Sequence, residues 1–180
     1  MKHDFKPYLN PVFIETGSYG GHGIKSAMDA GFKKVISIEV NDFFYQICKN
    51  RFKNYKKVVH LYFGDSIIVL PEVLKTINER CTFWLDGHYM SDPHTAGGVM
   101  PVPLMEELKA IAQHHIKNHT ILIDDIRLLR NHEAEWKDLP YCICDVEEFI
   151  HTINPNYKIT YVVGSDGVKN VKDDILVAQV

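Results

Sequence analysis

Short apolar runs alternate with longer stretches of helical periodicity along this chain, and that alternation is the strongest constraint on its fold. The runs are rich in β-branched residues and lie at residues 12–15, 34–39, 58–63, 82–86 and 120–124. Predicted helices follow them, one ending at Ala30 and others at about 42–54, 66–80 and 103–116. Apolar strands that are each followed by a helix indicate a parallel sheet covered on both faces. Right-handed crossovers then predict a doubly wound α/β fold.

The end of the chain departs from this alternation. We expect residues 127–145 to be irregular and residues 146–153 to form a short helix. Two further strands, at 158–164 and 174–180, are joined by a turn around 165–167 that leaves no room for a helix. Such a pair must be antiparallel. The prediction is a mostly parallel, seven-stranded, Rossmann-like sheet with a C-terminal antiparallel β-hairpin, whereas a dinucleotide-binding domain would be expected to end with a sixth parallel strand.

Composition indicates one globular domain and excludes several classes of partner. With 180 residues, the chain is long enough for a single domain, 1–180, with a sizeable core. Its formal net charge of -3 provides no basic field for nucleic acid or an anionic membrane. No apolar run approaches the ~18 residues that span a bilayer, and the first residues do not resemble a signal peptide. The four cysteines are interpreted as reduced structural thiols, so we expect a cytoplasmic protein.

Acidic residues follow each of the five predicted parallel strands. They are Glu15, Glu39, Asp65, Asp86 and the pair Asp124–Asp125. In an open α/β sheet, ligands bind beyond the carboxyl ends of the strands, which is where these side chains are expected to converge. Carboxylates crowded at one edge repel one another. The sequence therefore predicts a bound ligand or cation at that edge.

The loop after the first strand reads Glu15-Thr16-Gly17-Ser18-Tyr19-Gly20-Gly21 and is expected to bind a cofactor. Glycines allow a tight turn and a close approach of the backbone to a ligand. The spacing is not the G-x-G-x-x-G of a dinucleotide site. An acid directly before the glycines would repel a phosphate, yet it suits an ammonium or sulfonium group. A plain strand-to-helix turn is the alternative interpretation.

The second and third strands end in residues that suit a nucleoside. Glu39 lies 22 residues after Gly17, where an acid can accept both hydroxyls of a ribose. NAD and S-adenosylmethionine both need such a contact, and an acid that ends a strand is also common without a ligand. Asp65 and Ser66 are expected to cap the following helix, and Asp65 to accept the exocyclic amine of adenine.

The fourth and fifth strands predict a metal site. Asp86 ends one strand and Asp124–Asp125 the other, so three carboxylates are expected to converge. Oxygen ligands of this kind suit Mg²⁺ or another hard divalent ion. In the alternative interpretation, one of these acids caps a helix while another pairs with Arg127 or Lys109.

His88 follows Asp86 by two residues and is a candidate general base, because an imidazole beside a metal-bound hydroxyl can take its proton at neutral pH. A structural histidine is the alternative. Candidates for contact with a substrate are His94 and Thr95, further along the same loop, and Arg127, which follows the Asp pair.

These residues together resemble a known family. The series Glu15-x-Gly17, Glu39, Gly64-Asp65-Ser66, Asp86 and Asp124–Asp125 is similar to that of class I S-adenosylmethionine-dependent methyltransferases. It resembles in particular the metal-dependent sugar O-methyltransferases of the macrocin and mycinamicin type. That family also has five strand–helix units closed by a hairpin, and the similarity runs from Val12 to Val180.

The resemblance implies a role for each residue. Loop 15–21 would hold the amino acid half of S-adenosylmethionine, Glu39 its ribose, and Asp65–Ser66 its adenine. Asp86, Asp124 and Asp125 would hold Mg²⁺, which would orient two adjacent hydroxyls of a small acceptor such as a sugar. Asp86 would also contact the cofactor and take part in catalysis, with His88 as the general base.

One departure concerns the glycine motif, in which Tyr19 stands where the family has its second glycine and Gly20 comes one residue late. The acceptor pocket is expected to come from loops 87–102 and 127–145, or from a second subunit of a homo-oligomer. Two other functions remain open: a metal-dependent hydrolase, which would leave Glu15 and Glu39 without a purpose, and a catalytically inactive subunit of the same fold that binds a partner.

Overall fold

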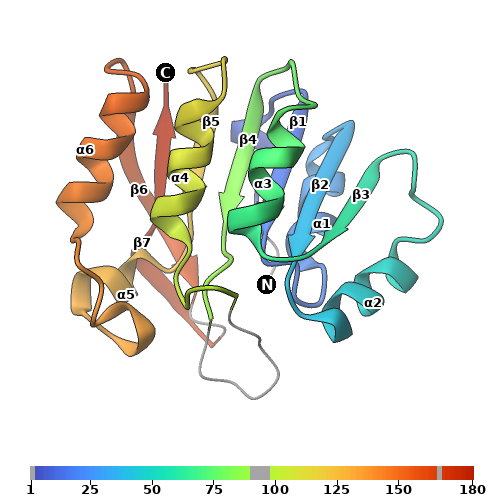
Figure 1. Cartoon of the computed structure of the whole chain (residues 1–180), viewed down its shortest axis with the longest axis horizontal. Helices are drawn as coiled ribbons and strands as arrows, with labels where there is room; N and C mark the ends of the chain where they lie inside the picture. The colour runs from blue at the N-terminus through green and yellow to red at the C-terminus, as the bar shows by residue number, and fades with distance from the viewer. Residues whose placement is uncertain (1–2, 90–97, 166–167) are drawn as a thin grey trace.

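One mixed sheet forms the centre of the molecule (Figure 1). The computed structural model describes residues 3–89, 98–165 and 168–180. The sheet has seven strands in the order β3-β2-β1-β4-β5-β7-β6. They are β1 (Val12–Thr16), β2 (Lys34–Glu39), β3 (Val59–Phe63), β4 (Cys81–Leu85), β5 (Thr120–Ile123), β6 (Lys158–Ser165) and β7 (Asn170–Gln179). β1 to β5 pair in parallel, whereas β7 runs antiparallel to β5 and β6. The predicted doubly wound sheet with a C-terminal antiparallel hairpin is confirmed.

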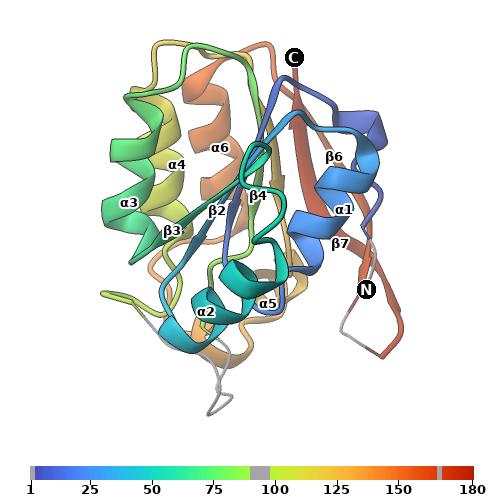
Figure 2. The same ribbon diagram turned by 90° about the vertical axis from the view of Figure 1, so that its right-hand side faces the viewer.

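Helices cover both faces of this sheet (Figure 2). One face carries α1 (His22–Ala30) and α2 (Asp42–Arg51), and the other α3 (Ser66–Leu74), α4 (Leu104–Gln113) and α6 (Ile143–Ile153). Successive strand residues point to opposite faces, so Ile14 packs in the core on the α3 side and Phe13 in the core on the α1 side. Burial on both faces explains why the strands are apolar throughout. Among the described residues, no helix has the length and apolar character that crossing a membrane requires.

Three predicted helices end earlier than expected. α2 ends at Arg51 rather than near residue 54, α3 at Leu74 rather than near residue 80, and α4 at Gln113 rather than near residue 116. Phe44 and Cys48 of α2 are buried, whereas Phe43 on the same helix is 63% exposed.

The prediction that residues 127–145 are irregular was wrong. This segment contains α5 (Ile126–Asn131) and the 3-10 turn η2 (Ala134–Trp136), and α6 begins already at Ile143. Helices of one or two turns are too short to show a hydrophobic period in the sequence. A second 3-10 turn, η1 (Lys6–Tyr8), precedes β1.

The register of the parallel strands aligns their carboxyl ends at one rim. Thr16 of β1 lies beside Ile38 of β2 and Leu85 of β4. The backbone pairing continues one residue further, since Asp86 N–H donates to Thr16 and Asp124 N–H donates to Leu85. The acids that follow the strands therefore start from the same edge, as the sequence predicts.

A buried pair of histidines lies at the opposite edge, where β4 and β5 begin. The Cys81 N–H donates to Nδ1 of His119 at 2.9 Å, and Nε2 of His119 lies 3.0 Å from Nδ1 of His114. Nε2 of His114 lies 3.0 Å from the carbonyl oxygen of Ile77. Both rings complete this chain of hydrogen bonds only when neutral, because each Nδ1 must accept a bond.

We expect this pair to make the protein sensitive to acid. Burial lowers the pKa of His119 from 6.5 to about 4, and unfavourable electrostatic interactions with His114 and Arg80 contribute to the decrease. Below pH 6.5 the unfolded chain therefore binds a proton that the folded chain does not, so the free energy of unfolding falls between pH 6.5 and pH 4. The loss between pH 7 and pH 5 is about 2 kcal/mol from this group.

Urea unfolding of the wild type and of His119→Gln at both pH values checks this expectation. The variant is less stable at pH 7, but it should lose about 2 kcal/mol less than the wild type on acidification. Equal losses in the two proteins would contradict the assignment.

Candidate functional site

A cavity of about 340 Å³ opens along the carboxyl edge of the sheet. Residues that end or follow successive strands line it: Gly17, Glu39, Asp65, Asp86 and, after β5, Asp125. The volume lies in the range typical of small-molecule sites. The cavity thus brings together one predicted site residue from each of the five strand ends.

Gly17 brings the loop after β1 into direct contact with the loop after β4. Its φ of +80° lies in the left-handed region that glycine adopts most readily. A Cβ at this position would overlap the carbonyl oxygen of Asp86 and lie 3.2 Å from Cα of Gly87. Only glycine lets the two backbones pass at this distance, so the first glycine of the motif is required by packing as well as by its turn.

Glu39 lies at one end of the cavity and holds the first loop by its backbone. Its Oε2 accepts hydrogen bonds from the N–H groups of Ser18 and Tyr19, each at 2.9 Å, and its Oε1 accepts one from Asn41 at 2.8 Å. Burial raises the pKa of Glu39, and these backbone donors oppose the rise. The carboxylate is therefore fixed in orientation at the cavity wall, as a ribose site requires.

Glu15 does not lie on the cavity wall. Its side chain points to the α1 side of the sheet, where Ser37 Oγ donates to Glu15 Oε2 at 2.6 Å and Gly23 of α1 leaves it space. Burial, partly opposed by the Ser37 hydrogen bond and supported by the charge of Glu39, raises the pKa of Glu15 to about 8. Glu15 supports the loop from behind, so the expected direct contact with a sulfonium does not follow from this geometry.

Of the other residues in the loop, only Tyr19 joins Gly17 on the cavity wall. Ser18 Oγ pairs with Ser37 Oγ at 2.6 Å, and Thr16 is buried beneath Gly87. The Gly20 carbonyl accepts a bond from Arg51, and Gly21 packs on Phe52 at the start of α1. These residues shape the loop through its backbone.

Asp65 caps α3, as predicted, and also binds the loop after β4. Its Oδ1 accepts from Ile67 N–H at 2.9 Å, and its Oδ2 accepts from Val99 N–H at 2.6 Å. Both Asp65 and Ser66 line the cavity. An adenine amine would therefore share the Asp65 carboxylate with two backbone donors.

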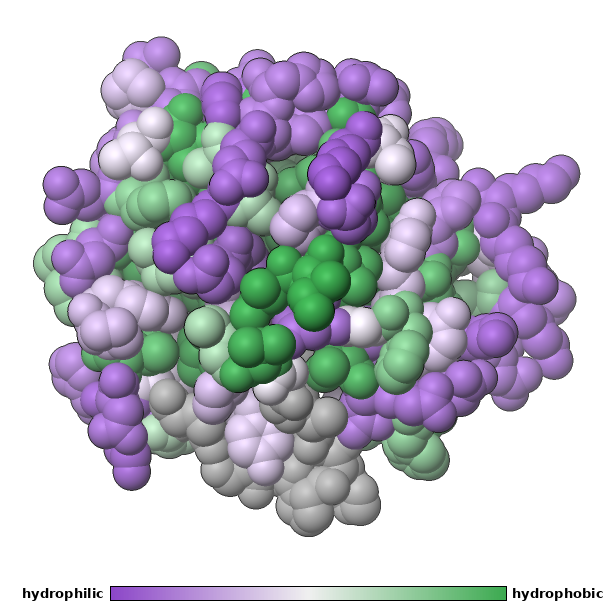
Figure 3. Space-filling view, viewed as in Figure 1, coloured by the Kyte–Doolittle hydropathy of each residue, from purple (hydrophilic) through white to green (hydrophobic). Residues whose placement is uncertain are grey.

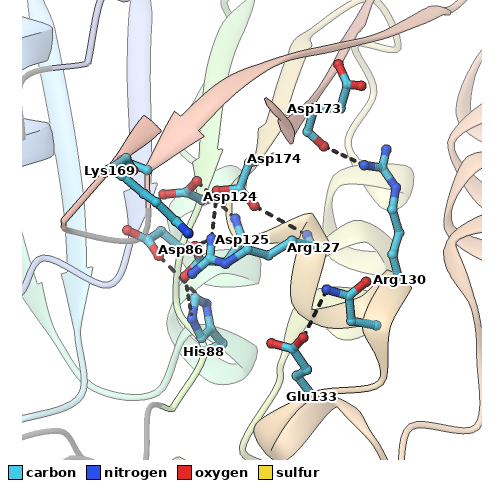
Figure 4. A network of polar contacts seen from close by, with 12 residues as sticks. Asp86, His88, Asp124, Asp125, Arg127, Arg130, Glu133, Lys169, Asp173 and Asp174 are labelled. Atoms are coloured by element: carbon cyan, nitrogen blue, oxygen red, sulfur yellow. Dashed lines mark hydrogen bonds and ion pairs between the residues drawn. The ribbon is translucent and has the colours of Figure 1, made fainter. Parts of the chain in front are cut away.

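Two overlapping groups of possible metal ligands share Asp125, which lies at the other end of the cavity (Figure 4). One consists of Asp86, His88 and Asp125, and the other of Asp124, Asp125 and Asp174. Within each group the ligand atoms lie within 4.8 Å of one another. The predicted set of Asp86, Asp124 and Asp125 does not form one such group. His88 is the third member of the group with Asp86 and Asp125, and Asp174 is the third member of the group with Asp124 and Asp125.

Positive side chains already compensate part of this acidic centre. Arg127 pairs with Asp125 and, at 2.6 Å, with Asp174. The pairing with Asp125 agrees with the alternative interpretation, in which one of the predicted acids pairs with Arg127. Lys169, which precedes β7, points toward the same centre (Figure 4). Burial would raise the pKa of Asp125, but its contacts with His88 and Arg127 outweigh that effect and lower it.

The pKa values of Asp86 and Asp124 are raised, unlike that of Asp125. Burial and then the charges of Asp124 and Asp125 raise the pKa of Asp86 well above its usual value. Burial and the charge of Asp125 raise the pKa of Asp124 to about 8. A cation beside them would keep both carboxylates ionised at neutral pH.

His88 is held between the loops that follow β4 and β5. Its side chain is only 5% exposed, and its Nε2 lies 3.0 Å from Oδ2 of Asp125, in an orientation that does not form a regular hydrogen bond. Nδ1 lies 3.7 Å from Oδ1 of Asp86, and the ring packs edge-on against Trp136. The imidazole thus lines the cavity at its acidic end.

Sequence reasoning missed two buried acids of this site. Asp174 lies on β7, far along the chain, and nothing in its local sequence marks it. Glu107 lies on α4 beneath Gly87, and burial, opposed by the hydroxyls of Ser66 and Thr16, raises its pKa to about 7. Its position among Leu104, Leu108 and Ile111 on the buried stripe of α4 was a usable signal.

The three candidate substrate residues have different outcomes. His94 and Thr95 lie outside the described residues. Arg127 reaches the acidic centre but is bound there by Asp125 and Asp174.

Exposed apolar side chains lie close in the sequence to residues that line the cavity. Val99 and Ile68 are largely exposed, and Met100 lines the cavity itself. Figure 3 shows an apolar area on the face that carries α3 and α4, next to the residues drawn in grey.

Comparison with known proteins identifies the fold. No protein-family model matches the chain, and no curated protein matches its sequence. The O-methyltransferase TomG from Streptomyces achromogenes, in complex with SAM, superposes with a TM-score of 0.64 and 13% identity over 98% of this chain and 75% of that chain. The O-methyltransferase from Bacillus cereus in complex with SAH (S-adenosylhomocysteine) gives 0.64 and 12% over 98% and 76%. A candidate methyltransferase from Streptococcus mutans with SAH gives 0.60 and 13% over 100% and 99%. The chain thus has the Rossmann-like fold of class I methyltransferases.

Proposed function

We propose that this protein is an S-adenosylmethionine-dependent O-methyltransferase that acts on a hydroxyl of a small molecule. One observation carries the proposal: a single cavity has Glu39 at one end and Asp86, His88 and Asp125 at the other. The first end suits the ribose of a nucleoside, and the second suits the activation of a hydroxyl. The fold, which O-methyltransferases with bound SAM or SAH share, supports the same function.

We assign a separate role to each of these cavity residues. Glu39 accepts the ribose hydroxyls, and Gly17 lets the backbone approach the ligand. S-adenosylmethionine, when bound, supplies a methyl group on a sulfonium. An unprotonated nitrogen of His88 accepts the proton of the acceptor hydroxyl as the new carbon–oxygen bond forms and the carbon–sulfur bond breaks. Holding the two reactants in line accounts for most of the expected rate enhancement.

We further propose that Mg²⁺ or another divalent ion binds at the acidic end. The raised pKa values of Asp86 and Asp124 fit such an ion, because a cation beside the two carboxylates would keep them ionised at neutral pH. Asp125 would hold it together with Asp124 and Asp174, or together with Asp86 and His88, and Asp125 would then exchange part of its contact with Arg127. The ion would lower the pKa of a bound hydroxyl. His88 belongs to the group of possible ligands that contains Asp86 and Asp125. An imidazole ligand would favour a transition metal over Mg²⁺.

The acceptor that we propose is a sugar or another small diol. Two adjacent hydroxyls suit a divalent ion beside several carboxylates, because the ion prefers oxygen ligands. The apolar side chains of Met100, which lines the cavity, and of its neighbour Val99 would accommodate an apolar part of the acceptor.

The experiment that tests the cofactor is calorimetric titration with SAH. We expect saturable binding to the wild type, and Glu39→Ala should weaken it by about 10- to 100-fold, because charge-assisted hydrogen bonds to two hydroxyls are lost. Glu79→Ala, an exposed glutamate at the opposite edge of the sheet, is the matched control and should bind SAH as the wild type does.

Two outcomes would overturn the proposal. A wild type that does not bind SAH favours a hydrolase that uses the Asp and His cluster without a nucleoside. Binding of SAH without methyl transfer to any member of a panel of sugars and catechols favours an inactive binding subunit.

A further inference from the structure

Tyr19 adopts a backbone conformation that usually requires glycine. Its φ is 42°, and it occupies the place of a glycine in the motif that the sequence resembles. A left-handed conformation costs a residue with a Cβ free energy, and such residues persist where surrounding contacts hold them, often at functional sites. The tyrosine therefore needs a compensating role at this position.

The surrounding contacts hold Tyr19 firmly by its backbone. Its N–H donates to Oε2 of Glu39 at 2.9 Å, and the thiol of Cys48 on α2 donates to its carbonyl oxygen at 3.3 Å. Both contacts lie on the side of the loop that faces β2 and α2. The side chain leaves from this fixed point into the cavity wall.

The ring of Tyr19 is positioned but not buried. It packs on the ring of Phe44 with centroids 4.3 Å apart, and both residues line the cavity. Tyr19 remains 53% exposed, whereas Phe44 beneath it is buried. An aromatic face held against a cavity by a second ring is a suitable surface for a flat or apolar ligand group.

We infer that the Tyr19 ring forms the wall of the nucleoside half of the cofactor site. Three cavity residues on the same side, Ile38, Val40 and Phe44, are apolar and flank Glu39. The acidic centre with Asp86 and His88 belongs to the loop after β4, away from β2 and α2. The ring therefore covers the adenosine and not the sulfonium. This inference rests on the proposed function.

The test measures affinities for SAM and SAH in three variants of Tyr19. Tyr19→Gly removes the ring and suits the positive φ, and it should lower both affinities by about tenfold and by the same factor, since the two ligands share the adenosine. Tyr19→Phe keeps the ring and should bind like the wild type. Tyr19→Asn removes the ring but tolerates the left-handed conformation, so it serves if the glycine variant does not fold.

The matched control is His132→Gly. His132 also has a positive φ, 52°, but it is exposed at the end of α5 and does not line the cavity. The substitution makes the same change of backbone freedom, and both affinities should stay at the wild-type value.

The outcomes separate this inference from the proposed function. A wild type that binds neither ligand overturns the proposed function, and the inference with it. If the wild type binds and Tyr19→Gly or Tyr19→Asn binds equally well, the inference alone is wrong. A much larger loss for SAM than for SAH would place the ring at the sulfonium. A loss of affinity in Tyr19→Phe would assign the effect to the hydroxyl. Either of these last two results would also overturn the inference.

Discussion

Replacing His88 by glutamine is expected to slow methyl transfer by about 10²- to 10⁴-fold while the affinity for SAH stays unchanged. Glutamine has a similar volume, but it cannot accept a proton at neutral pH. His88 lines the acidic end of the cavity, away from Glu39, so the nucleoside contacts should persist. The measurement is the formation of SAH from SAM with a panel of sugars and catechols, alongside calorimetry with SAH.

His151→Gln is the matched control, because His151 is exposed on α6 and should not affect turnover. The same assay tests the metal, since a chelator should stop turnover in the wild type and Mg²⁺ or Mn²⁺ should restore it. Full activity of His88→Gln would remove His88 from the role of general base. Full activity with chelator would refute the metal but not the methyltransferase.

Gly17→Ala is expected to have the largest effect on stability, with a loss of more than about 3 kcal/mol in the free energy of unfolding. The new Cβ would overlap the carbonyl oxygen of Asp86, so the loops after β1 and β4 would have to separate. The substitution also forces alanine into a positive φ. Because both loops line the cavity, binding of SAH should be lost as well. Urea unfolding and calorimetry measure the two effects.

Gly31→Ala separates the cost of backbone strain from the cost of a steric overlap with a neighbouring loop. Gly31 has a φ of +107°, yet nothing lies within 4 Å of the place of its Cβ. This variant should lose only the cost of the strained conformation, about 1–2 kcal/mol, and should bind SAH normally. Equal losses at positions 17 and 31 would show that the contact with Asp86 is unimportant.

Most of the fold could be predicted from the sequence because its signals are local. Apolar runs buried on both faces indicate parallel strands, and a segment too short for a helix between residues 164 and 174 requires a hairpin. Asp65 was recognisable as a helix cap from its position alone. The short helix α5 was missed, because six residues show no periodicity.

The site could be predicted only as a set of residues at one edge. Strand alternation already places Glu15 on the same face as Phe13, the α1 side, so its absence from the cavity wall could have been foreseen. The second partner of Arg127 could not, because Asp174 lies 47 residues away on an antiparallel strand.

The sequence by itself determined which elements form, in what order, and which acids lie at the carboxyl edge, because these features depend on neighbours a few residues apart. Only the tertiary structure decided how those acids are grouped. Asp125 is shared between His88 and Arg127, Asp174 joins from β7, and Glu107 lies beneath Gly87. Each of these contacts joins separate elements, so its geometry depends on how the helices and the hairpin pack against the sheet, which no local pattern records.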